Sequence, residues 1–260
     1  MLVATWNVNS LRVRLPQLLD WLAREQPDVV GLQETKVVDD DFPQPQLREA
    51  GYEAVFVGQR TYNGVALLSR RPPVDAQTVL PGREDDPQQR FVAASYGDLR
   101  VVNVYVPNGS AVGSDKYAYK LAWLADLRRY LESALVRWPR LLVMGDFNIA
   151  PADIDVHDPV AWQGRVLVSP AERAAFAALT ALGLHDAFRT LYPDRQVFTW
   201  WDYRAAAFRR DQGLRIDHLL VSDAVREACR SCRVELDLRR LERPSDHAPV
   251  VLELDLPAPG

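Results

Sequence analysis

Several short apolar runs, scattered over the whole chain, each carry a polar or charged side chain at one end. Runs of this length suit strands, and strands packed in sheets can bring their ends to one edge. Residues far apart in the sequence would then meet at a single edge of the fold. The runs and their polar neighbours are Leu2 to Thr5 before Asn7, Val29 to Gln33 before Glu34, Val101 to Val104 before Tyr105, Leu141 to Gly145 before Asp146 and Asn148, the run that Asp217 opens, and a last segment with Asp246 and His247.

Helical patterns lie between these runs. Leu15, Leu18, Leu19 and Leu22 share one face at spacings of three and four, and Pro27 stops that helix. The longest helix is predicted over about 116–138. A third begins at Ser169-Pro170-Ala171-Glu172, where Ser169 caps the helix and Glu172 completes a capping box, and it ends at Gly183.

The middle of the chain reads as strands joined by short turns, which favours antiparallel neighbours. Strand clusters in both halves, with helices between them, predict a layered α/β (α+β) sandwich with two mainly antiparallel sheets rather than a wound parallel sheet. The further strands are expected at 52–58, 65–69, 74–79, 91–96, 99–106, 216–222, 233–238 and 250–254.

Length and composition fit one domain. With 260 residues and 48% hydrophobic content, the chain can bury a large core, so residues 1–256 are expected to form a single domain and 257–260 a short tail. No apolar stretch is long enough to span a bilayer, and the N-terminus lacks a signal-peptide pattern, which predicts a cytoplasmic protein without membrane contact. Cys229 and Cys232 are too few for a structural zinc site and are interpreted as reduced thiols.

Three of the strand-end residues suit a hard cation. Glu34 directly follows an apolar strand, so its carboxylate would emerge at the sheet edge. Magnesium prefers oxygen ligands and keeps several waters, so few protein ligands suffice. Asn7 could add an amide oxygen and Asp246 a second carboxylate through water.

The remaining strand-end residues suit hydrolysis of a phosphodiester. In Gly145-Asp146-Phe147-Asn148 the glycine permits a tight turn that exposes both polar side chains. Asp146 could orient the attacking water or protonate the leaving group, and Asn148 could donate to a phosphate oxygen. Asp217 is a candidate to fix the tautomer of His247. Tyr105 could hydrogen-bond a phosphate oxygen, although a tyrosine that merely packs on a loop is the competing interpretation.

Together these segments resemble the exonuclease III type of AP endonuclease, within the endonuclease/exonuclease/phosphatase superfamily. The resemblance is nearly full length and rests on eight blocks in order. They are Thr5 to Arg12, Leu32 to Lys36, Asn63 to Ala66, Tyr105-Val106-Pro107-Asn108-Gly109, Gly145 to Asn148, Trp200 to Arg204, Leu214 to Asp217, and Pro244 to Pro249.

This resemblance implies a four-layer, DNase I-like sandwich and hydrolysis of duplex DNA 5′ to abasic sites. It also implies 3′ to 5′ exonuclease and 3′-phosphatase or 3′-phosphodiesterase activity at 3′-blocked ends. The implied cofactor is Mg²⁺, with Mn²⁺ as a substitute, and we expect a monomer. By this likeness the metal ligands are Glu34, Asn7 and Asp246, and the catalytic residues are His247, Asp146, Asp217, Tyr105 and Asn148.

The resemblance further implies a small apolar pocket for the abasic sugar. By motif it falls on Trp200, Leu214 and Ile216, with Trp201 as a further candidate. A nucleotide without its base costs little to flip out, and such a pocket excludes a normal base by size. Asn108 and Arg204 are expected to contact the DNA, and local basic residues can do so despite a formal net charge of −4.

Two other functions stay open from the sequence. An inositol-phosphate or lipid phosphodiesterase could share the fold, but the tryptophan-rich block near Trp200 favours DNA. A DNA-binding or scaffolding module without catalysis is the second, and the presence of Glu34, Asp146, Asp217 and His247 argues against it.

Overall fold

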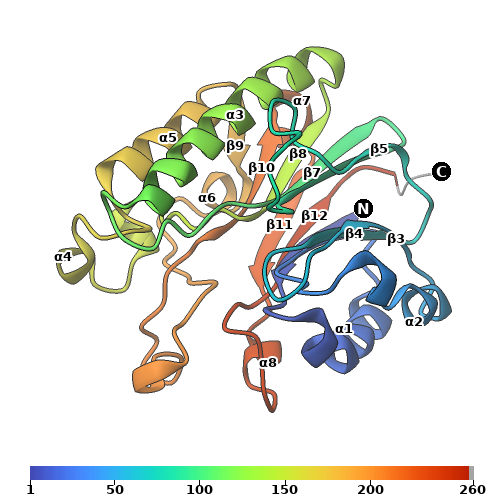
Figure 1. The fold of residues 1–260 in the computed structure, drawn as a ribbon, viewed down its shortest axis with the longest axis horizontal. Helices are drawn as coiled ribbons and strands as arrows, with labels where there is room; N and C mark the ends of the chain where they lie inside the picture. Colours follow the sequence, from blue (N-terminus) through green and yellow to red (C-terminus); the bar gives the residue numbers. More distant parts are fainter. Residues whose placement is uncertain (258–260) are drawn as a thin grey trace.

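The computed structural model of the chain describes residues 1–257. Residues 258–260 of the expected tail lie outside the described residues. Two six-stranded sheets pack face to face, and helices cover both outer faces, which gives four layers (Figure 1). The expected α/β sandwich is therefore confirmed, with one parallel pair in each otherwise antiparallel sheet.

The first sheet has the strand order β11-β12-β1-β2-β4-β3. Its β1–α1–β2 unit is parallel, as the strand–helix–strand pattern predicts, and the other neighbours are antiparallel. The strands are β1 (Leu2–Asn7), β2 (Val29–Gln33), β3 (Glu53–Val57), β4 (Val65–Ser69), β11 (Cys229–Val234) and β12 (Val250–Leu254).

The second sheet has the order β5-β6-β7-β8-β10-β9. Here β7 and β8 are parallel and joined by the long helix α3 (Asp115–Arg137). The strands are β5 (Val74–Gln77), β6 (Phe91–Tyr96), β7 (Leu99–Tyr105), β8 (Leu141–Asp146), β9 (Leu184–Asp186) and β10 (Asp217–Ser222).

Helices pack on the outer faces because each has one apolar stripe. One core joins the first sheet to α1 (Leu11–Glu25) and α2 (Gln44–Glu49), and another joins the second sheet to α3 and α5 (Pro170–Thr180). A third core fills the space between the sheets. Short helices complete the chain at α4 (Pro159–Trp162), α6 (Ala187–Leu191), α7 (Asp223–Arg226) and α8 (Leu236–Arg239).

The strand predicted at 233–238 is wrong in its bounds. The strand β11 ends at Val234, and Leu236–Arg239 forms the helix α8 instead. Cys229 and Cys232 lie in β11 as free, buried thiols, as expected of reduced core cysteines. No described helix is long and apolar enough to cross a membrane.

Register brings the polar strand ends to one edge. In the first sheet Asn7 pairs with Gln33, the residue before Glu34. In the second sheet Asp146 lies between Tyr105 and Asp217 on the neighbouring strands. Because β12 runs antiparallel to β1, the segment before β12, with His247, also starts at this edge.

A buried amide pair joins the two sheets just behind this edge. Gln33 Nε2 donates to Asn103 Oδ1 at 2.6 Å, and Asn103 Nδ2 donates to the carbonyls of Leu32 and Ala66 at 2.9 Å. Both side chains are fully buried. Since buried polar groups are costly unless bonded, this pair favours one alignment of β2 against β7, and so of Glu34 against Tyr105.

Gly145 allows β8 to approach β7 closely before Asp146. It has φ +145°, and an added Cβ would lie 1.9 Å from the Val104 carbonyl oxygen. We therefore expect Gly145→Ala to lower the free energy of unfolding by more than about 1 kcal/mol, because the backbone must move. Urea unfolding measures this loss, and Gly97→Ala, at an open turn with φ +60°, serves as a control for strain without a clash. Equal losses in the two variants would contradict the close approach.

Candidate active site

Three ionisable side chains meet at the convergent edge. One ligand atom from each of Glu34, Asp146 and His247 lies within 4.8 Å of the others. They come from the end of β2, the end of β8 and the segment before β12. The convergence expected from the strand ends is thus present in the structure.

Asn7 bridges the two carboxylates. Its Nδ2 donates to Glu34 Oε1 at 2.8 Å and to Asp146 Oδ2 at 2.9 Å, while its Oδ1 accepts from the Asn9 amide. In this arrangement the amide nitrogen, not the oxygen expected for a metal ligand, faces the cluster. Asn7 therefore holds the two carboxylates at a fixed separation.

Asp217 orients His247 from behind. His247 Nδ1 lies 2.9 Å from Asp217 Oδ2, and its Nε2 lies 3.7 Å from Asp146 Oδ2. Burial alone would lower the pKa of His247, but the Asp217 and Asp146 carboxylates raise it well above the ordinary value. The imidazole thus carries a proton on the nitrogen that faces Asp217.

Asp146 is nearly fully buried. Burial raises the pKa of Asp146, and the neighbouring Asp217 and Glu34 charges add to the rise, against the opposing effect of His247. Its Oδ1 accepts the Asn148 backbone amide at 2.8 Å, and the Asn148 side chain donates to Oδ2 at 3.3 Å. A carboxyl with a raised pKa is suited to take up and release a proton near neutral pH.

Tyr105 faces the same cluster from the end of β7. Burial, followed by the nearby Glu34 charge, raises the pKa of Tyr105 well above 10, so its hydroxyl stays a donor. The Arg90 guanidinium lies 4.6 Å from the centre of the Tyr105 ring and donates to the Tyr105 carbonyl. The sequence does not predict this role of Arg90, because no local pattern marks an arginine before a strand as one that stacks on a tyrosine ring.

Lys36 and Asn9 are two further polar neighbours that the sequence patterns did not single out. Lys36 Nζ lies 2.8 Å from Glu34 Oε2, and Lys36 lowers the pKa of Glu34 against the opposing effect of burial. Asn9 Nδ2 donates to Asp246 Oδ1, and Trp200 Nε1 donates to Asp246 Oδ2. Asp246 is thus engaged beside the cluster and contributes no atom to it.

Trp200, Leu214 and Ile216 come together as expected, in one apolar cluster with Leu167 and Val168. Leu214 and Ile216 are fully buried, so the half-buried Trp200 presents the exposed surface. Trp201 does not join them: it packs against Phe208 in a separate cluster.

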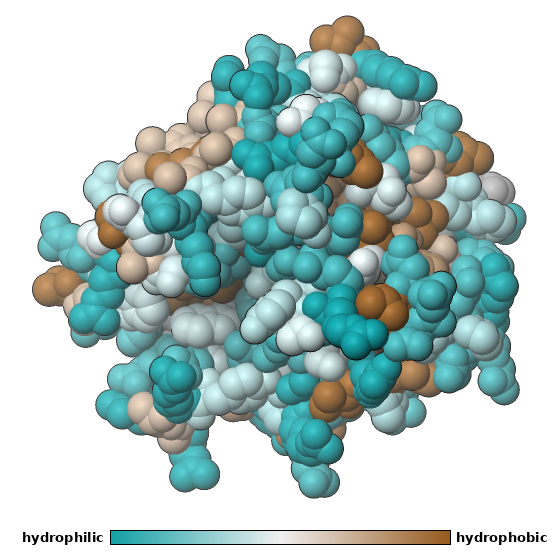
Figure 2. Space-filling view, in the orientation of Figure 1, coloured by the Kyte–Doolittle hydropathy of each residue, from teal (hydrophilic) through white to brown (hydrophobic). Residues whose placement is uncertain are grey.

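Grooves with basic residues flank the cluster. One of about 490 Å³ contains Tyr105, Asn108, Arg90 and Lys116, and a second of about 450 Å³ contains Arg12, Lys36 and Arg60. Arg204 lies apart from both, on an exposed turn at Arg204–Ala206. Figure 2 shows one face on which hydrophilic residues dominate and hydrophobic ones are scattered.

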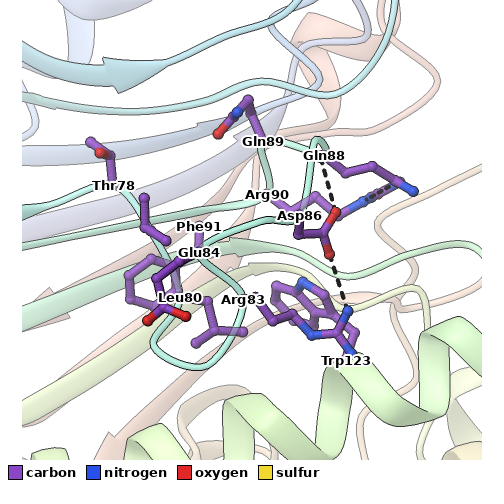
Figure 3. Close-up of a pocket in the computed structure, with 11 residues that line it drawn as sticks. Thr78, Leu80, Arg83, Glu84, Asp86, Gln88, Gln89, Arg90, Phe91 and Trp123 are labelled. Atoms are coloured by element: carbon purple, nitrogen blue, oxygen red, sulfur yellow. Dashed lines mark hydrogen bonds and ion pairs between the residues drawn. The ribbon is translucent and has the colours of Figure 1, made fainter.

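Charged side chains that line a smaller cavity near β6 are already paired with neighbouring groups (Figure 3). Arg83 pairs with Asp86 and Asp126, and Asp86 also accepts from Tyr119. No cation in it is free for a ligand apart from Arg90, which belongs to the groove beside Tyr105.

A second ionic cluster supports the segment under Trp200. Arg215 donates to Asp155 and Asp186 at 2.7 Å each, and His218 bridges Arg215 to the Ile149 carbonyl. His218 is therefore structural. Burial would raise the pKa of Asp186, but Arg215 and His218 hold it well below the ordinary value.

We expect Arg215→Met to lower the free energy of unfolding by about 3–5 kcal/mol at pH 7, since two carboxylates lose their buried partner. The contribution through Asp186 is complete above pH ~4, the ordinary pKa of aspartate, and is lost as the pH falls toward the depressed pKa. Urea unfolding of wild type and variant at pH 7 and pH 3 measures this contribution. A difference between wild type and variant that is unchanged at pH 3 would contradict this role.

The donors of the cluster fit a hard divalent cation. The Glu34 carboxylate, close to that of Asp146, is an oxygen donor of the kind that suits Mg²⁺ or Mn²⁺, whereas the protonated His247 has no lone pair for a metal. Two negative charges held close together in a buried place also favour a cation over an empty site.

Comparisons with known proteins agree with this geometry. The Endonuclease/Exonuclease/phosphatase family model matches residues 4–247. Exodeoxyribonuclease III of Haemophilus influenzae is 39% identical, over 96% of this chain and 98% of that protein. The 3′ phosphatase NExo from Neisseria, solved with a product DNA hairpin, is 48% identical with a TM-score of 0.97, over 98% of this chain and 100% of that one. An AP endonuclease from Archaeoglobus fulgidus is 36% identical with a TM-score of 0.94, over 98% and 100%. The chain therefore belongs to the endonuclease/exonuclease/phosphatase family, within its exodeoxyribonuclease III type.

Proposed function

We propose that this protein is a metal-dependent DNA repair hydrolase that cleaves 5′ to abasic sites and removes blocking groups from 3′ ends. The observation that carries the proposal is the meeting of Glu34, Asp146 and His247 at one edge, with Asp217 behind His247. Relatives named as an exodeoxyribonuclease, a 3′ phosphatase and an AP endonuclease support it. We propose Mg²⁺ as the ion, with Mn²⁺ as a substitute, and a monomer as the active form.

Each side chain of the cluster has a different role in the attack of water on phosphorus. Asp146, with its raised pKa, orients the attacking water and accepts its proton. Tyr105 and Asn148 donate hydrogen bonds to phosphate oxygens, and the protonated His247 stabilises the charge that grows on them. A bound divalent ion would supply further positive charge at the phosphate and at the leaving oxygen.

The surroundings of the cluster support a DNA substrate. Basic residues in the two grooves can follow a phosphate backbone on either side. Trp200, over the apolar floor of Leu214 and Ile216, can hold a sugar without its base. Asp246 orients Trp200 through the indole nitrogen.

A gel assay on labelled duplexes tests this function. One duplex carries an abasic analogue, a second a 3′-phosphate at a nick, and a third is undamaged. We expect cleavage of the first and dephosphorylation of the second with Mg²⁺, neither with EDTA, and little action on the third. Salt is varied because backbone contacts weaken steeply with ionic strength. Cleavage without a divalent ion, or none at any salt concentration, would contradict the proposal.

A further inference from the structure

A lysine and a glutamate form a fully buried ion pair behind the active-site loops. Lys120, in α3, and Glu172, in α5, have no exposed side-chain surface, and Lys120 Nζ lies 2.5 Å from Glu172 Oε1. Neither residue reaches the metal-binding cluster. Charges in such a place are rare unless each is fully bonded.

The ammonium group of Lys120 uses all three of its N–H donors. Besides Glu172, Nζ donates to the carbonyls of Asn148 at 2.7 Å and Asn108 at 3.1 Å. The side chains of these two asparagines face the site: Asn108 Nδ2 donates to Asn148 Oδ1 at 3.1 Å, and Asn148 Nδ2 lies against Asp146. One ammonium group thus holds the backbones of two site loops that are 40 residues apart.

Glu172 extends the link to the apolar wall. Its carboxylate accepts from the backbone amides of Leu167 and Ser169 and from the Ser169 hydroxyl. Leu167 has φ +78° and packs with Leu214 and Ile216. A leucine in this conformation needs support from its surroundings, and the Glu172 carboxylate supplies it.

We propose that Lys120 and Glu172 are positioning residues, which fix the Asn108 and Asn148 loops relative to the apolar wall under Trp200. An apolar pair of the same volume could fill the same space, but it would leave the carbonyls of Asn108 and Asn148 without a donor. The effect on catalysis rests on the proposed function, whereas the effect on loop order does not.

The test separates positioning from folding. Lys120→Met alone leaves the buried Glu172 carboxylate without its charged partner, so we expect a lower urea midpoint. The double variant Lys120→Met/Glu172→Gln removes both charges, and its midpoint should lie above that of Lys120→Met, although the Asn108 and Asn148 carbonyls still lack their donor. Its kcat should nevertheless stay about 10- to 100-fold low, with a smaller change in KM, because the asparagine loops are misplaced. Amide hydrogen exchange should become faster at 108–110 and 147–150, with no change at 127–131.

Leu127→Ala is the matched control, because Leu127 is fully buried on the same helix and packs in the core away from the site. It should lower the urea midpoint and leave kcat within about twofold of wild type. A double variant that regains stability, kcat and slow exchange together would overturn the proposal. If wild type cleaves no DNA with metal, the proposed function fails, while hydrogen exchange still decides whether the pair orders the loops.

Discussion

Replacing His247 with asparagine is expected to lower kcat for cleavage of abasic duplex DNA by about 10³-fold. Asparagine can still donate to Asp217, so the fold should survive, but the charge and the second ring nitrogen are lost. That nitrogen faces Asp146 at 3.7 Å, where charge on the phosphate would develop. Single-turnover cleavage with saturating metal measures the loss of the chemical step.

His185→Asn is the matched control for this variant. His185 lies 2.6 Å from Asp223 at the surface, in a histidine–carboxylate pair like that of His247 with Asp217 but away from the cluster. It should keep wild-type cleavage. If His247→Asn retains activity within about tenfold of wild type, the histidine supplies neither charge nor proton transfer at the reacting phosphate.

Glu34→Gln is expected to raise the metal concentration for half-maximal activity by at least about 10-fold. Glutamine keeps the size of the side chain but removes its negative charge, and it leaves Lys36 without its carboxylate partner. Titration of cleavage with Mg²⁺ and Mn²⁺ measures the shift. His247→Asn should mainly lower the plateau of the same curve.

Glu53→Gln, at an exposed pair with Arg48, controls for the loss of one negative charge elsewhere. It should leave the titration curve unchanged. Identical curves for Glu34→Gln and His247→Asn would remove Glu34 from the role of metal ligand.

The parts that followed from sequence are those with strong local signals. Apolar runs predicted the strands of both sheets apart from β9 and most of β11, helical periodicity predicted α1 and α3, and the capping box predicted α5. The capping box of Ser169 and Glu172 is present as predicted. The convergence at one edge followed from polar residues at strand ends, because register then fixes where those ends lie.

The parts that sequence missed depend on tertiary contacts. The helix α8 has only four residues, too short for a periodic signal, so its leucines fit the pattern of a continuing strand. Glu172 was recognised as a cap but not as the partner of Lys120, 52 residues away. Similarly, Asn7 turns its nitrogen toward Glu34 and Asp146 because two carboxylates lie nearby, which only the fold reveals.

The central claim is that Glu34 and its neighbours form a site for one divalent ion at the sheet edge, beside Asp146 and His247. Anomalous diffraction from crystals soaked in Mn²⁺ tests it most directly. We predict an anomalous peak about 2.1 Å from carboxylate oxygens of this cluster, lost in Glu34→Gln crystals. A saturated Mn²⁺ site held by other residues, with no peak at the cluster, would contradict the account.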